Sequence, residues 1–141
     1  MARINMGKVV VAGLLAGLVL NVGDFLINGV LMAADFQATA TRLGLDPAVM
    51  DSGSTIATWV IVDFVMGIVL VWNYAAVRPR FGPGPATAIV GAVAPFLAIT
   101  LIMFGLTGMG FFTMAIFVKS TLFSAINFAI GAVAGAWLYS E

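Results

Sequence analysis

Neither cysteine nor histidine occurs among the 141 residues of the chain. Their absence excludes disulfide bonds, thiolate nucleophiles, metal sites built from Cys or His, histidine-ligated haem and acid–base dyads that use histidine. Glycine-rich phosphate-binding loops and the sequence context of a serine nucleophile are lacking as well. We therefore expect a protein that is not an enzyme and that holds neither a cofactor nor a metal ion.

Charged residues are almost as scarce, because Asp, Glu, Lys and Arg make up only 9% of the chain. Six basic residues balance six acidic ones, which leaves no basic field for a nucleic-acid partner. Apolar residues make up 62%, and such a chain cannot cover a water-facing surface with polar groups. The composition therefore predicts an integral protein of the cell membrane (inner or plasma membrane), surrounded by the lipid bilayer.

Four apolar segments are long enough to cross a bilayer core about 30 Å thick, which takes about 20 helical residues. Because lipid-exposed backbone must form its hydrogen bonds internally, and the alternating pattern of barrel strands is missing, we expect helices. The predicted spans are residues 8–33, 55–77, 85–107 and 110–138. The sequence thus predicts an all-α membrane four-helix bundle that forms a single domain over residues 1–141.

Basic residues predict the orientation of this bundle. Arg3 and Lys8 precede the first span, Arg78 and Arg80 join the second to the third, and the loop 34–54 holds one arginine against three aspartates. Because Lys and Arg are enriched in cytoplasmic loops, we expect both termini on the cytoplasmic side.

The connections between the spans carry their own signals. The outer loop, residues 34–54, is expected to contain a short interfacial helix near 35–43. Asp46 and Pro47 suit the N-cap and first position of a further one-turn helix. On the cytoplasmic side, residues 78–85 are expected to form a stiff turn, because proline fixes φ and cannot propagate a helix.

Small and polar residues form a stripe on each of two spans, at spacings that place them on one helical face. The stripe on the first span comprises Gly13, Gly17, Asn21, Asp24 and Asn28. The stripe on the fourth span comprises Ser120, Ser124, Asn127, Gly131 and Gly135. Because the two spans run antiparallel, we expect them to pack directly, with Gly13 and Gly17 against Gly131 and Gly135. An oligomer contact through the same glycines is the alternative.

Three ionisable residues lie inside the predicted spans: Asp24, Asp63 and Lys119. Counted at about 1.5 Å per residue from the span centres, they share one level on the outer side of the midplane, together with Thr100. A charge in the bilayer costs about 2.5–3.5 kcal/mol on insertion scales, so we expect Lys119 to pair with one aspartate. Three interpretations stay open: an ion pair that fixes helix register, a proton or cation site, and contact with a partner subunit.

The first span also resembles a known group of proteins. Its segment from Gly13 to Asn28, GLLAGLVLNVGDFLIN, is similar to the first span of small, uncharacterised four-helix bacterial membrane proteins. The resemblance implies a four-helix membrane fold and no particular activity.

Two functions are compatible with these features. The first is a non-enzymatic structural or accessory subunit of a homo-oligomer or larger membrane complex. The alternative is a small proton- or cation-coupled transporter or channel that uses Asp24, Asp63 and Lys119, with a polar lining. That lining would comprise Asn21, Asn28, Thr100, Ser120, Ser124 and Asn127. A water-filled vestibule that reaches either aspartate would favour transport, whereas a sealed cluster would favour an architectural role.

Overall fold

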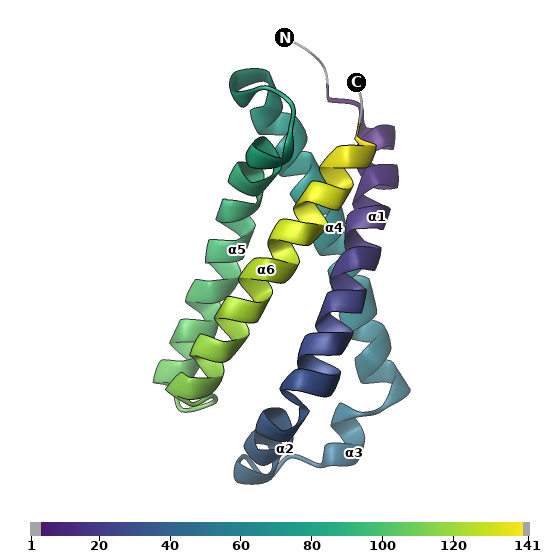
Figure 1. Ribbon diagram of the computed structural model, residues 1–141. Helices are drawn as coiled ribbons and strands as arrows, with labels where there is room; N and C mark the ends of the chain where they lie inside the picture. The colour runs from purple at the N-terminus through teal and green to yellow at the C-terminus, as the bar shows by residue number, and fades with distance from the viewer. Residues whose placement is uncertain (1–3, 140–141) are drawn as a thin grey trace.

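The computed structural model describes residues 4–139 and is helical, with no strand in this range (Figure 1). Four helices in it are long and apolar enough to cross a membrane. They are α1 (Met6–Leu26), which continues into the π-helical turn η1 (Ile27–Leu31), α4 (Gly53–Phe81), α5 (Pro85–Gly108) and α6 (Met114–Leu138). The expected all-α architecture with four candidate spans is thereby confirmed.

Local sequence signals explain where these helices begin. The side chains of Asn5, Ser52 and Thr113 precede α1, α4 and α6, and each accepts a hydrogen bond from a backbone N–H of the first turn. Such caps satisfy donors that have no partner within the helix. The helix α5 begins instead with Pro85, whose fixed φ suits a first helical position.

The two short helices lie between α1 and α4, as expected from the outer loop. They are α2 (Ala33–Arg42) and α3 (Pro47–Met50). The Asp46 carboxylate accepts a hydrogen bond from the N–H of Ala48 at 2.9 Å, which confirms the predicted cap.

The turn between α4 and α5 is shorter than predicted. Pro79 lies inside the last turn of α4, which ends at Phe81. Pro79 has no N–H to bond the carbonyl of Ala75, yet α4 continues for two more residues. The chain then reverses at Gly82 and Gly84, whose φ values of 81° and 136° favour glycine.

The four long helices form a bundle in which each runs antiparallel to the next along the chain. Both described ends of the chain therefore lie at the same end of the bundle (Figure 1). The helix α1 packs against α4 and α6, while α5 packs against α4 and α6 from the other flank. The larger buried apolar cluster lies in the half of the bundle near the chain ends and includes Val9, Ala16, Leu20, Leu70, Val71, Tyr74, Ala88 and Ala132. A smaller cluster at the opposite end comprises Ile27, Met32 and Ile116.

The helix α2 is fastened to the turn between α5 and α6 at that opposite end. The guanidinium of Arg42 donates to the carbonyl oxygens of Gly110 at 2.8 Å and Phe111 at 2.7 Å. The ring of Phe36 meets that of Phe112 edge to face, with centroids 6.4 Å apart. Cationic donors and an aromatic pair thus hold the outer-loop helix against the second helical hairpin.

Three glycines allow the backbones of α1 and α4 to touch, and we call this contact the glycine seam. A Cβ atom added at Gly67 would collide with the backbone of Gly13 and Gly17. Conversely, a Cβ at Gly13 would lie 2.6 Å from Cα of Ile68, and one at Gly17 would lie 2.6 Å from Cα of Phe64. The predicted pairing of Gly13 and Gly17 with the glycines of α6 is therefore wrong.

The glycines of α6 face a different side of α1. A Cβ at Gly131 would lie 2.9 Å from Leu20 Cδ2 of α1, while one at Gly135 would collide with the Val71 side chain of α4 and lie 3.0 Å from Ala16 Cβ of α1. The first and fourth spans are direct neighbours, as expected, but alanine and leucine side chains of α1 form that contact. One face of α1, with Gly13 and Gly17, contacts α4, and the adjacent face, with Ala16 and Leu20, contacts α6.

Candidate functional site

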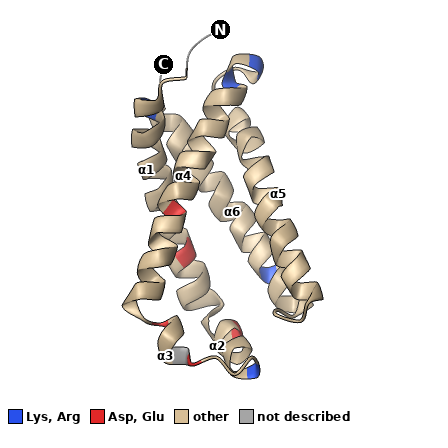
Figure 2. Ribbon diagram, turned by 180° about the vertical axis from the view of Figure 1, so that it is seen from behind, with Lys and Arg blue, Asp and Glu red and all other residues tan. Residues whose placement is uncertain are grey.

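Polar side chains from three helices meet midway along the bundle, and we call this group the polar junction. It consists of Asp24 of α1, Asp63 of α4 and Asn127 of α6. The amide of Asn127 donates to Asp24 Oδ1 at 2.8 Å and to the carbonyl oxygen of Leu20 at 3.1 Å. Asp63 and Asn127 are only 8% and 5% exposed. Acidic residues are visible at this level in Figure 2.

The carboxyl groups of Asp24 and Asp63 are close enough to interact electrostatically. Two adjacent carboxylates repel, so this arrangement is favourable only when one carboxyl carries a proton or a cation lies between them. Residues 4–139 contain no group of three or more Asp, Glu, His or Cys that could hold a metal ion.

Two further residues complete the surroundings of the junction. Asn21 donates to the carbonyl oxygens of Gly17 at 2.9 Å and Val60 at 3.3 Å, and so joins α1 to α4. Gly23 was not expected to matter, yet a Cβ atom there would collide with the amide of Asn127. Its position beside Asp24, on a span that approaches a second helix, is the only signal in the sequence that points to it.

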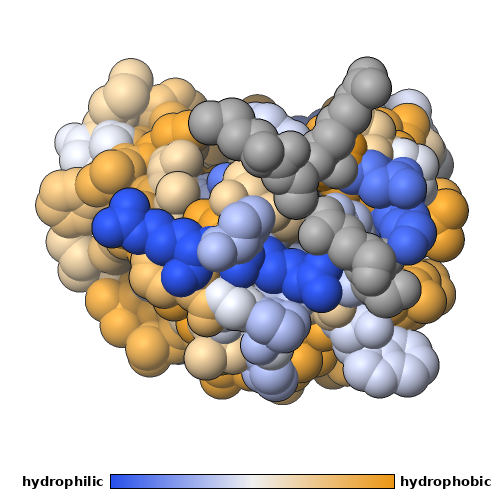
Figure 3. Space-filling model, turned by 90° about the horizontal axis from the view of Figure 1, so that it is seen from above, coloured by the Kyte–Doolittle hydropathy of each residue, from blue (hydrophilic) through white to orange (hydrophobic). Residues whose placement is uncertain are grey.

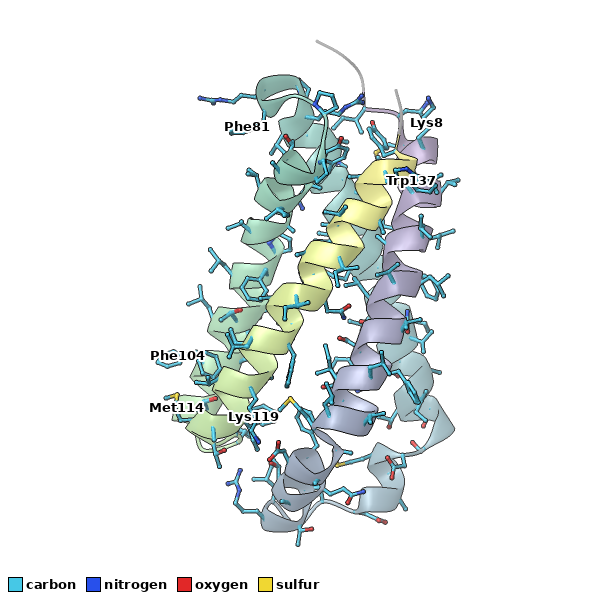
Figure 4. All side chains as sticks on the ribbon, viewed as in Figure 1. Lys8, Phe81, Phe104, Met114, Lys119 and Trp137 are labelled. Atoms are coloured by element: carbon cyan, nitrogen blue, oxygen red, sulfur yellow. The ribbon has the colours of Figure 1, made fainter. Side chains whose placement is uncertain are left out.

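Lys119 lies outside the junction, and its expected pairing with Asp24 or Asp63 is wrong. Its Nζ contacts Asp35 Oδ2 on α2 at 2.9 Å, with the two side chains 53% and 31% exposed. The long lysine side chain reaches toward the end of the bundle (Figure 4), where α2 supplies a carboxylate. The predicted pairing was based on the depth of each residue along its own span, and this count did not include α2, which packs at the end of the bundle.

The other residues of the predicted polar lining do not gather at the junction. The hydroxyl of Thr100 donates to the carbonyl of Phe96 at 2.9 Å, and that of Ser120 donates to the carbonyl of Phe117 at 3.1 Å. Both bonds stay within the residue's own helix. Asn28 lies in η1 and is exposed, and Ser124 is half-buried.

Two grooves on the surface of the bundle lie away from the junction. One, of about 510 Å³, is lined by α5 and α6 residues from Ile89 to Trp137. The other, of about 220 Å³, is lined by the start of α1 together with Leu138. Neither is lined by Asp24, Asp63 or Asn127. The junction thus connects helices without opening into either groove.

Comparison with protein-family models, with curated proteins and with solved structures found no match for this chain. Chemically, the junction can hold three helices together through hydrogen bonds, and its carboxyl pair can carry a proton.

The contact between Lys119 and Asp35 predicts a mild effect of Lys119→Met. We expect a loss of unfolding free energy of about 1 kcal/mol or less, because the pair is half-exposed and screened. Unfolding in detergent by heat or denaturant measures it, with Asp35→Asn as the matched partner variant. A loss above about 3 kcal/mol would indicate a buried counter-charge for Lys119 instead.

Proposed function

We propose that the chain is a non-enzymatic integral membrane protein that serves as a structural or accessory subunit of a homo-oligomer or a larger membrane complex. The observation that carries this proposal is the use of two amides, buried Asn127 and half-buried Asn21, in contacts between helices. Asn21 bonds α1 to α4, and Asn127 bonds α6 to α1. Polar groups used in this way stabilise a bundle and leave no free donors for a substrate.

The outer half of α5 supports a role in assembly. None of its residues from 93 to 108 is buried, and Cβ atoms at Gly105 and Gly108 would meet no neighbouring atom within 4 Å. Phe104 in this segment and Met114 at the start of α6 also project outward (Figure 4). An apolar helix that packs so little within its own chain offers a surface to a second protein chain.

Site-specific crosslinking in native membranes tests this assignment. A photoreactive residue at Leu101 on α5 should yield one discrete protein adduct, identified by mass spectrometry as this chain or another. Leu122 on α6 is similarly exposed, at 62% against 67%, and serves as the control position. Equal yields of lipid adducts alone at both positions, with a monomeric mass in mild detergent, would contradict the proposal.

The proposal places both termini in the cytoplasm. A single cysteine introduced at position 45 in the outer loop should react with a membrane-impermeant maleimide in intact cells. A cysteine at position 2 should react only after the membrane is permeabilised. Labelling of position 2 in intact cells would show that the termini lie outside the cell and would contradict this orientation.

A second candidate function is proton- or cation-coupled transport through the carboxyl pair. It is favoured by one observation, the proximity of the Asp24 and Asp63 carboxyl groups without the lysine expected as counter-charge. Purified protein in proteoliposomes would then catalyse a pH-dependent cation flux that Asp63→Asn abolishes. Under the proposed subunit role, neither the parent protein nor the variant produces flux.

A further inference from the structure

The two ends of the bundle differ in what lies across them. Near the chain ends, hydrophilic side chains stand on the surface between apolar flanks (Figure 3). At the other end, α2 lies as a separate short helix below the long ones (Figure 1). It follows α1 through η1, yet its side chains contact α6 and the turn between α5 and α6. The helix α2 thus bridges the α1–α4 hairpin and the α5–α6 hairpin.

The polar contacts of this bridge are exposed. The guanidinium of Arg42 donates to two backbone carbonyls just beyond the end of α5, where helix carbonyls lack a partner and the helix dipole favours a cation. Lys119 and Asp35 form the second polar contact, which is also open to solvent. Because water competes for such partners, these contacts can break while the rest of the bundle stays folded.

The apolar contacts of the bridge lie between α2 and the polar junction. They belong to the smaller buried cluster, which comprises Ile27, Met32 and Ile116 with Phe36, Phe112 and Phe123 packed against it. On α1, Ile27 follows Asp24 by three residues, and on α6, Phe123 precedes Asn127 by four. Both helices therefore reach the cluster about one turn beyond the junction, on the side where α2 lies.

The backbone departs from α-helical geometry on both sides of α2. Before it, η1 is π-helical, and Met32 at its end has φ −114° and ψ 8°. After it, Gly44 has a φ of 67°, and a Cβ there would meet no atom within 4 Å. Gly44 therefore serves the backbone rather than packing. Such positions at the ends of an element absorb the changes in φ and ψ when that element moves.

We propose that α2 is a strap that opens and closes over the smaller apolar cluster, and that the contacts of Arg42 and Lys119 hold it shut. Opening breaks these exposed contacts and admits water to Ile27, while the long helices stay packed through the glycine seam. It costs less free energy than unfolding, because only two residues of α2, Thr39 and Ala40, are buried. The strap is independent of the subunit role, since all its contacts lie within one chain.

Cysteine reactivity tests the strap, because the chain has no cysteine of its own. Ile27→Cys places a thiol in the smaller cluster, and Val71→Cys places one in the larger cluster near the chain ends. Each buried thiol reacts with a water-soluble maleimide only when local opening lets water reach it. In detergent, Arg42→Ala should raise the rate at Ile27→Cys about tenfold, which corresponds to about 1.4 kcal/mol in the opening equilibrium. The rate at Val71→Cys should stay the same.

Gln37→Ala is the matched control, because Gln37 is an exposed residue of the same helix. It should leave both rates unchanged. Equal rates at Ile27→Cys with and without Arg42→Ala would overturn the proposal. An equal rise at Val71→Cys would also overturn it, because Arg42 would then stabilise the whole bundle rather than hold the strap shut.

Discussion

Gly67→Val should destabilise the bundle by about 3 kcal/mol or more, because the new side chain would have to occupy the space of the α1 backbone. A Cβ at this position collides with the backbone of Gly13 and Gly17, which cannot move aside as a flexible side chain could. We expect a large fall in the midpoint of thermal unfolding in detergent, and loss of the native contact between the first two spans.

Gly105→Val provides the matched control for this substitution. Gly105 also lies within a long apolar helix, but a Cβ there would meet no neighbouring atom within 4 Å. Its replacement should change stability by less than about 1 kcal/mol, the scale of helix propensity. Similar losses for the two variants would mean that valine in a helix, rather than the glycine seam, accounts for the effect.

Asn127→Leu should cost about 1.5–3 kcal/mol, because Asp24 and the carbonyl of Leu20 both lose a buried donor. Asn73→Leu is the control, since Asn73 donates only to the carbonyl of Val69 within its own helix, at 2.9 Å. That variant should lose less than about 0.5 kcal/mol. Denaturant unfolding in detergent measures both.

A double-mutant cycle assigns the loss at Asn127 to its partner. Combining Asn127→Leu with Asp24→Leu should show a coupling of at least about 0.5 kcal/mol, because the two side chains share a hydrogen bond. Additive losses would indicate that the bond to Leu20 carries the whole effect of Asn127.

Hydropathy and capping chemistry predict much of this fold. The four long helices, the outer-loop helix and the cap at Asp46 follow from local sequence, because each depends on residues within a few positions of one another. The partner of each helix face does not follow from local sequence. Gly13 and Gly17 indicate that another backbone comes close, but Gly67 in the interior of α4, which has no second glycine at helical spacing, is the residue that meets them.

The polar junction was predicted only in part, because residue type indicates which side chains need a polar partner but not which partner the fold supplies. Asp24 and Asp63 are costly residues in an apolar helix, which predicts that they share one polar level, whereas Asn127 was expected only in a polar lining and not as the donor to Asp24. Lys119 has the same cost but a longer side chain, which reaches the end of the bundle and Asp35. Only the fold of the chain around η1 determines that α2 offers a carboxylate there.

The glycine seam also bears on the order in which the protein assembles during synthesis. It joins α1 to α4, which both precede α5 and α6 in the chain, so this hairpin can form before α5 and α6 have been made. Asn127 lies on α6, which follows both of these helices in the chain. Asp24 and Asp63 are therefore on helices that can already be paired, and they receive the amide of Asn127 only when α6 packs against α1.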